Sequence, residues 1–406
     1  MPVVKTGLLA AALAAIGAAA FVLDVALMQG MTRQLHMNDF GKFYYSARAY
    51  LDGGDMYASN PATDLKFAEA PELQFLNMNP PQFHLVVLPL AMLTPELAVT
   101  IWLGLSILAL VVSILLIVRE IGVTWTPMRL LAVVAGALAF AATQSFFITG
   151  QLSLLLLLAL TVCWVAARHG RWMAAAALLG ASASVKPFLL VFVPYLMLTR
   201  RFRALAVVAV VAVVSFGAGW FVFGGDAYRA WYRALSQSGD WAWAVMNAST
   251  LAWFRRAFDT QPIGTPLVVA PALVKGWVVA AVAVGVVTLV ACMRSDVDRS
   301  FALLLVAAQL MSPLGWIYYL WLPAGPVAAV AMRRQRDGVP WTPATRALIA
   351  VAAIGFVYPM PFLLAFRTHA WATLTIASIY FWATLALWLW LLVDHRQRAG
   401  ARASMR

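Results

Sequence analysis

Apolar segments follow one another along this chain, and they limit its fold more than any other feature. Only 11% of the 406 residues are charged, whereas about a quarter of a soluble domain is charged. So few charges cannot cover a protein surface in water, which excludes a cytosolic enzyme or a secreted domain. We place the segments at about residues 7–28, 97–118, 130–147, 152–167, 172–185, 187–199, 204–223, 268–292, 300–312, 316–332, 346–364 and 371–393. The sequence therefore predicts an all-α polytopic membrane protein, a single transmembrane domain over residues 1–406 with about 12 helices.

Arginine and lysine are unevenly distributed between the connecting segments. With the N-terminus inside, 18 of the 29 basic residues but only five acidic ones fall on the inner face, and this excess equals the net charge of +13. Cytoplasmic loops carry such an excess. We therefore expect the protein to lie in the inner (plasma) membrane, with both termini in the cytoplasm. This topology leaves two large outer loops, 29–96 and 224–267, and a basic, disordered cytoplasmic tail, 394–406, that binds anionic lipid and no nucleic acid.

The first outer loop contains a recognisable helix. Phe40, Phe43, Tyr44, Ala47 and Leu51 share one face of a helix over residues 40–51. Asn38 and Asp39 are suitable N-caps, and Gly53-Gly54 ends the pattern. We expect this aromatic, amphipathic helix to lie flat at the outer membrane interface. A second short apolar stretch, 82–93, predicts a juxtamembrane or re-entrant helix.

Polar motifs collect at the predicted outer ends of the helices and predict one outward-facing cavity. They are Asp39-Phe40, Asn79-Pro80-Pro81, Gly150-Gln151, Lys186-Pro187, Asn247-Ala248-Ser249 and Ser312–Tyr319. Apart from Arg346, the first residue of the segment 346–364, the only charged residues inside the predicted spans are Asp24 and Lys275, both near outer ends, whereas ion-coupled transporters need ionisable groups near mid-membrane. The sequence also lacks a metal-ligand cluster and a phosphate-binding glycine loop. Its two cysteines, Cys163 and Cys292, lie in apolar runs and predict no disulfide framework.

An acidic residue just after the first helix, within a long outer loop, resembles the layout of the GT-C superfamily of polytopic glycosyltransferases. The order of the motifs is similar to that of glycosyltransferase family 87, which contains polyprenol-phosphate-mannose-dependent mannosyltransferases. The matching residues, within about 30–335, are Asp39-Phe40 with Tyr44 and Tyr45, Pro80-Pro81 with Pro89-Leu90, Gly150-Gln151, Lys186-Pro187 with Arg200-Arg201, Asn247-Ala248-Ser249 and Ser312-Pro313 with Trp316. The family's Ser-Pro-x-Ser-Trp element is usually followed by histidines. Here Gly315 replaces the second serine, and Tyr318 and Tyr319 stand where histidine is expected.

The resemblance implies transfer of a hexose, mannose in the family, from a polyprenyl-phosphate donor at the outer leaflet. The acceptor is a hydroxyl of a glycolipid, a polysaccharide or a protein, and neither a cofactor nor a metal is implied. Such a reaction needs a base at the acceptor hydroxyl and positive charge at the leaving phosphate. Asp39 is the candidate base; its alternative role is to cap a helix, and both roles can coexist.

The candidate binding residues each have a structural alternative. Lys186 is a candidate for the donor phosphate, but a lysine at this depth also reaches the interface by snorkelling. Arg255 and Arg256 are second candidates for phosphate, or part of a solvated loop. The remaining donor- or acceptor-binding candidates are Gln151, Asn247, Tyr44, Ser312, Trp316, Tyr318 and Tyr319. Helix caps, interhelical hydrogen bonds or aromatic-belt anchoring explain these residues as well. His36, three residues before Asp39, is a weaker candidate.

Two other functions fit the same sequence. A transporter or flippase of lipid-linked sugars would share the outward cavity, but it also needs an inward polar path. A catalytically inactive relative would serve as the partner subunit of another enzyme, which the missing histidines allow.

Overall fold

Three long helices begin at a Thr-Pro pair. They are α4 (Pro95–Glu120), α5 (Pro127–Ala139) and α16 (Pro343–Val357), and in each the threonine is the N-cap and the proline the first helical residue. Proline suits this position because its fixed φ is already helical and the amide hydrogen that it lacks would have no partner there. Local sequence thus sets where these helices start, as it does at α2 (Asp39–Leu51), which ends two residues before Gly53 with its positive φ of 79°.

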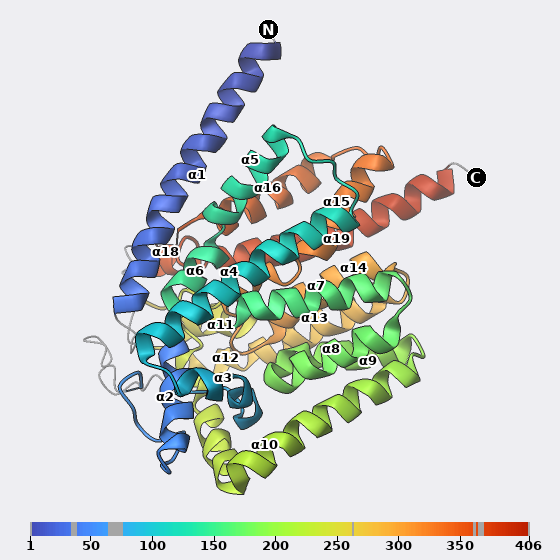
Figure 1. Ribbon diagram of the computed structural model, residues 1–406. Coiled ribbons are helices and arrows are strands. Elements are labelled where there is room, and N and C mark those ends of the chain that lie inside the picture. The colour runs from blue at the N-terminus through green and yellow to red at the C-terminus, as the bar shows by residue number, and fades with distance from the viewer. Residues whose placement is uncertain are drawn as a thin grey trace.

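The computed structural model describes residues 2–33, 39–63, 76–261, 264–359, 363 and 369–404, and its named elements are all helices (Figure 1). The others are α1 (Pro2–Arg33), η2 (Pro81–Phe83), α3 (His84–Ala91), α6 (Ala141–Thr149), α7 (Ser153–Arg168), α8 (Trp172–Val185), η3 (Pro187–Val191), α9 (Phe192–Leu198), α10 (Phe202–Ser236), η4 (Ser238–Trp241), α11 (Thr250–Phe258), α12 (Pro271–Val274), α13 (Gly276–Cys292), α14 (Val297–Met311), η5 (Ile317–Trp321), α15 (Ala324–Arg336), α18 (Ala370–Leu374) and α19 (Ile379–Ser404). The all-helical class is therefore confirmed.

Fewer helices than twelve are long enough to cross a membrane by themselves. In the described residues five qualify by length and composition, and a sixth if α5 and α6, bent by 49° at Phe140, form one span. The five are Gly7–Gly30, Pro95–Glu120, Phe202–Trp241, Pro271–Cys292 and Ala370–Asp394. The other predicted spans contain shorter helices, so the count of twelve stays a prediction.

Two of the shorter pairs turn back within the bundle. Arg201, after α9, places its guanidinium 3.6 Å from the ring centroid of Trp172, at the start of α8. Arg333, near the end of α15, forms ion pairs with Asp296 and Asp298 at the start of α14. Each pair therefore starts and finishes at the same end of the bundle, in agreement with the prediction that 172–199 and 300–332 are split segments.

Helix α2 forms where the sequence predicts it, but its aromatic face is covered by protein. Phe40, Phe43 and Ala47 are fully buried, and Phe43 packs edge to face on Phe83. Phe40 and Phe43 also contact Trp102 of α4, with ring centroids 5.4 and 6.1 Å apart. The expectation that this face lies on the membrane surface is therefore wrong, because α3 and α4 cover it.

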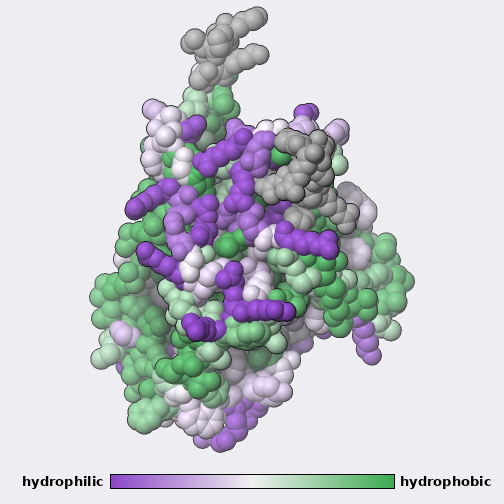
Figure 2. Space-filling view, turned by 90° about the vertical axis from the view of Figure 1, so that its right-hand side faces the viewer, coloured by the Kyte–Doolittle hydropathy of each residue, from purple (hydrophilic) through white to green (hydrophobic). Residues whose placement is uncertain are grey.

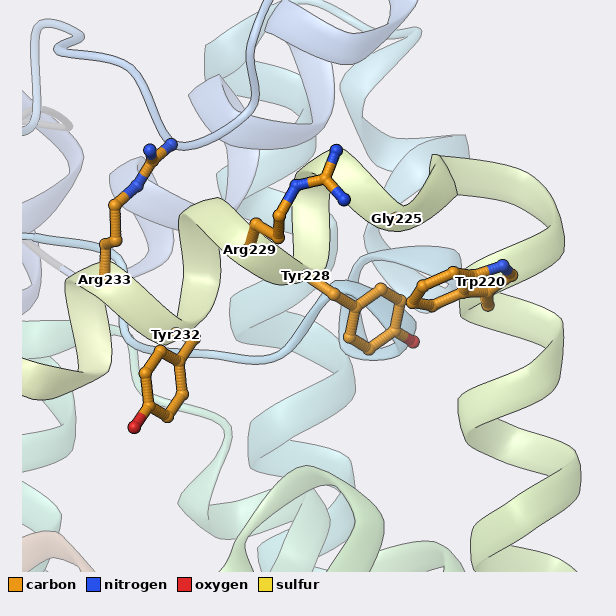
Figure 3. Close-up of a pocket in the computed structure, with 6 residues that line it drawn as sticks. All are labelled: Trp220, Gly225, Tyr228, Arg229, Tyr232 and Arg233. Carbon is orange, nitrogen blue, oxygen red and sulfur yellow. The ribbon is translucent and has the colours of Figure 1, made fainter.

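The predicted second outer loop is largely helical. α10 continues to Ser236 across a kink at Gly224, whose φ of 75° and ψ of 171° are not helical. Figure 3 shows the continuation turned sideways, with Arg229 and Arg233 on one side of it and Tyr228 and Tyr232 on the other. Aromatic and cationic faces of this kind are typical of a helix lying in a membrane interface.

Several residues predicted for the inner face lie together at one end of the bundle. Arg168 bonds Glu120 and Asp298, at 2.7 and 2.9 Å, and Arg336 donates to the Ile121 carbonyl. Figure 2 looks onto this end and shows hydrophilic side chains gathered over its upper middle, with hydrophobic side chains on both flanks. The side of the membrane that this end faces stays a prediction. The tail, expected to be disordered, is helical through Ser404 because α19 continues into it.

One buried carboxylate holds three helices together at this end. Asp394 of α19 forms ion pairs with Arg299 of α14 and Arg334 of α15, and the side chains are at most 4% exposed. We expect Asp394→Asn to lower the free energy of unfolding by about 3–5 kcal/mol, because it leaves two buried guanidinium groups without this charge. Thermal unfolding in detergent is followed with a thiol-reactive fluorophore, since Cys163 and Cys292 are buried and free.

The matched control for this experiment is Asp52→Asn. Asp52 pairs with Arg48 at 3.0 Å, but both side chains are about half exposed, and exposed pairs contribute little. We expect almost no shift of the melting temperature in this variant. Equal shifts in the two variants would show that Asp394 has no special structural role.

Candidate active site

The predicted outward-facing residues meet at the opposite end of the bundle, where Figure 1 shows α2, α3 and α11 on its left. Asp39 is the first residue of α2, Gln151 lies between α6 and α7, and Lys186 lies between α8 and η3. Tyr318 and Tyr319 belong to η5. Four segments distant in sequence therefore contribute to one polar cluster within an apolar bundle.

The Asp39 carboxylate is at the centre of this cluster and only 7% exposed. Lys42, one helical turn later, lies with Nζ 2.5 Å from Oδ1. Gln151 donates from Nε2 to Asp39 Oδ2 at 2.8 Å and to the Tyr318 hydroxyl at 3.3 Å. The orientation of the Gln151 amide is fixed because its Oε1 accepts from the Leu152 backbone amide at 3.0 Å. Two donors on separate elements therefore hold the carboxylate in one position.

Lys186 also belongs to this cluster, where it contacts Asn79 and Tyr319. Its Nζ donates to Asn79 Oδ1 at 2.7 Å and lies 5.7 Å from the ring centroid of Tyr319. The residue lies in the turn after α8, where burial lowers its pKa to about 7, while the charge of Asp39 acts to raise it. Among the described residues its hydrogen-bond acceptor is an amide and not a carboxylate. The amino group of Lys186 is therefore held in place by a neutral partner.

Asn247 and the predicted Ser312–Tyr319 segment support the cluster. Asn247 donates to the Pro313 carbonyl at 2.8 Å and accepts from the Gly315 amide at 2.9 Å, and its backbone pairs with Trp316. Trp316 in turn stacks on Tyr318, with centroids 6.2 Å apart. Ser312 accepts a bond from the Leu314 amide at 3.3 Å. These contacts position η5, and with it Tyr318.

Three other predicted binding residues have partners elsewhere. Tyr44 donates to the Leu93 carbonyl at 2.7 Å. Arg255 pairs with Asp259 at 3.0 Å, and Arg256, 1% exposed, donates to the carbonyls of residues 243, 244 and 247 and to a serine hydroxyl. The structure does not join them to Asp39 or Lys186 by a hydrogen bond or ion pair. His36 lies outside the described residues.

Lys42, Asn77 and His84 are not among the site residues predicted from the sequence. Lys42 is one helical turn after Asp39, so the i,i+3 spacing indicated their ion pair. Asn77 and His84 flank the Asn79-Pro80-Pro81 motif, and Asn77 bonds both Asn79 and His84. The density of amide side chains around a proline turn was the available signal for this second network.

A family model, glycosyltransferase family 87, matches residues 77–313. The matched range contains Asn77, Asn79, Gln151, Lys186 and Asn247, whereas Asp39 and η5 lie outside it and join the site through the contacts given above. No curated protein and no solved structure matches the chain. The family match spans well over half of the 406 residues, and the chain therefore belongs to glycosyltransferase family 87, a family of glycosyltransferases.

Proposed function

We propose that this glycosyltransferase moves a hexose, mannose by analogy with its family, from a polyprenyl phosphate to a hydroxyl of a glycolipid or polysaccharide. The observation that carries the proposal is the cluster in which the charge of a buried carboxylate, Asp39, acts on an ammonium group, Lys186, whose hydrogen-bond acceptor among the described residues is an amide. Transfer from a lipid phosphate needs these two groups, a base at the acceptor and a cation at the leaving phosphate.

In the proposed reaction the acceptor oxygen attacks C1 of the sugar. The bond from C1 to the phosphate oxygen breaks, and its electron pair leaves with the polyprenyl phosphate. The hydroxyl proton passes to Asp39. A single displacement of this kind inverts the configuration at C1, so the stereochemistry of the product is a direct record of the mechanism.

The contacts of Asp39 suit a base. Lys42 and Gln151 each occupy one lone pair of a different carboxylate oxygen, and a carboxylate has about four acceptor positions. Lone pairs therefore remain for the acceptor hydroxyl. Fixing the carboxylate beforehand removes the need to orient it during the reaction.

Lys186 suits the leaving phosphate. A lysine ammonium acts as a compact point charge for phosphate, and the Tyr319 ring face at 5.7 Å stabilises it further. With this cation present the proposed reaction uses no metal. We also propose that the site faces outward from the inner (plasma) membrane, with both termini in the cytoplasm, because this arrangement accounts for the asymmetry of the basic residues.

The role of Asp39 is tested by Asp39→Asn in nanodiscs. The protein is offered a panel of radiolabelled polyprenyl-phosphate sugars as donors and a lipid and glycan extract of the host as the source of acceptors. We expect the rate of transfer to fall by about 10²–10⁴-fold, the usual effect of losing a general base. In the wild-type product, the configuration at C1 of the sugar should be inverted relative to the donor. Asp52→Asn, at an exposed residue directly after the same helix, is the control and should transfer normally. Unchanged transfer in Asp39→Asn would exclude Asp39 as the base, and wild type that transfers no sugar would favour a transporter or an inactive partner subunit.

The role of Lys186 predicts a pH dependence of donor binding. Since its pKa is about 7, the free enzyme loses this charge as the pH rises through neutrality, while a sugar-phosphate diester keeps its single charge. The KM for the donor should therefore rise with pH between about 6 and 9, and this rise should be absent in Lys186→Arg, because a guanidinium stays protonated.

Lys186→Met should have a high donor KM at every pH, while Lys275→Met, at the exposed start of α13, should behave like wild type. A KM that follows the same pH profile in wild type and in Lys186→Arg would show that another group binds the phosphate.

A further inference from the structure

His84 is completely buried at the start of α3, and the proposed reaction does not use it. Its Nδ1 lies 3.3 Å from the Pro80 carbonyl oxygen, and its Nε2 lies 2.8 Å from Asn77 Nδ2. The carbonyl oxygen only accepts hydrogen bonds, so Nδ1 carries the proton. Nε2 then has a free lone pair and accepts from Asn77. Burial lowers the pKa of His84 to about 4, which keeps the ring in this neutral form at physiological pH.

The neutral ring determines which way the Asn77 amide points. Its Nδ2 donates to His84 Nε2 and also to Ser46 Oγ, both at 2.8 Å. Its Oδ1 must then face the opposite way, where it accepts from the Asn79 backbone amide at 3.1 Å and from Asn79 Nδ2 at 3.2 Å. All four bonds are consistent with one orientation of the amide, and a flipped amide would place an oxygen against the lone pair of Nε2.

The orientation of Asn77 in turn determines that of Asn79. Because Asn79 Nδ2 donates to Asn77, Asn79 Oδ1 points away and accepts from Lys186 Nζ at 2.7 Å. If Asn79 were reversed, its amide hydrogens would face the ammonium group and repel it. Asn79 is also held by its carbonyl, which accepts from the Tyr57 hydroxyl at 2.6 Å.

The network also joins Lys186 to the helix that holds the proposed base. We call the series of hydrogen bonds from His84 through Asn77 and Asn79 to Lys186 the relay. Ser46 and Asp39 both belong to α2, so the bond from Asn77 to Ser46 fixes the relay to that helix. Asp39 and Lys186 are thereby placed by the same helix, Asp39 directly and Lys186 through two amides.

We propose that His84 is a positioning residue for the donor phosphate: as the neutral Nδ1–H tautomer it orients Asn77 and Asn79 so that an amide oxygen holds Lys186 without cancelling its charge. This inference rests on the proposed function, in which Lys186 binds a lipid phosphate. An amide oxygen fixes the ammonium group by one hydrogen bond, whereas a carboxylate in the same place would compete with the phosphate.

Asn79→Asp gives the sharpest test. A carboxylate at this position bonds Lys186 at least as firmly, although it loses the bond from Asn79 Nδ2 to Asn77 and keeps only the bond from the backbone amide. A role of Asn79 that only anchors Lys186 would therefore be preserved. Our inference instead requires that the ion pair weaken phosphate binding. The probe is farnesyl phosphate, with neutral farnesol reporting binding of the chain alone, and affinity for the purified protein in detergent is measured by native mass spectrometry.

In Asn79→Asp we expect the affinity for farnesyl phosphate to fall by about tenfold or more, consistent with the loss of a charge-assisted contact. The affinity for farnesol should stay the same. Asn79→Asp that binds farnesyl phosphate as tightly as wild type would overturn the inference.

A pair of His84 variants tests the relay at its origin. Gln places a side-chain oxygen near the position of Nε2 and can still accept from Asn77, whereas Phe cannot. We expect His84→Phe to raise the donor KM about tenfold with little change in kcat, and His84→Gln to restore most of the donor affinity. Equal KM values in the two variants would contradict the relay. If His84→Phe does not fold, Asn77→Asp replaces it: its carboxylate cannot donate to His84 Nε2 or to Ser46, so the same rise in donor KM is expected, and an unchanged KM would contradict the relay.

The binding measurement separates this inference from the proposed reaction. If wild type prefers farnesyl phosphate over farnesol and Asn79→Asp removes that preference, the relay is supported even if no sugar is transferred. If wild type shows no such preference, Lys186 does not bind phosphate and the inference fails with that role.

Discussion

The end of the bundle that holds the candidate site depends on the hydrogen bond that joins Asp39 to Gln151 across 112 residues of sequence. A carboxylate in apolar surroundings is stable only with partners, and Gln151 is in place to be one because Trp102 donates from its indole nitrogen to the Gly150 carbonyl at 2.7 Å. The same indole ring packs against Phe40 and Phe43 of α2. Aromatic packing and the polar bond therefore support one another, since Trp102 fixes both the helix that begins at Asp39 and the turn that ends at Gln151.

The site contains two lysines whose charges have different uses. Lys42 is paired directly with Asp39, so its charge is neutralised and its effect is to hold the carboxylate. Lys186 is held by an amide oxygen and an aromatic face, neither of which cancels charge. In the proposed reaction this distinction matters: the amide oxygen and the ring face partly offset the cost of burying the Lys186 ammonium group, and both would remain in place when a phosphate binds, as preorganised electrostatic catalysis requires.

The sequence predicted the helical class, the helix at 40–51 and the grouping of the polar motifs, because each follows from local composition or periodicity. It did not predict that α2 is covered by protein, since the burial of Phe40 depends on Trp102, far along the chain. The kink at Gly224 was equally hidden, because a glycine in an apolar run does not by itself show whether a helix ends or turns. The His84 relay could not be found from spacing, because its meaning depends on which atom of each amide faces which neighbour.

The residues that depart from the family pattern are physically connected. At Gly315 a Cβ atom would lie 2.2 Å from the Gln309 carbonyl oxygen, so the serine expected from the family does not fit this backbone. The close approach lets the Gly315 carbonyl accept from the Ala248 amide at 2.8 Å, which fixes the segment leading into η5. Tyr318 then lies where its hydroxyl meets Gln151. A tyrosine in place of histidine contributes a hydrogen bond but no positive charge near neutral pH. The proposed stabilisation of the leaving phosphate therefore rests on Lys186. The neutral amide that holds this lysine is then more important than it would be in a site with a second cation.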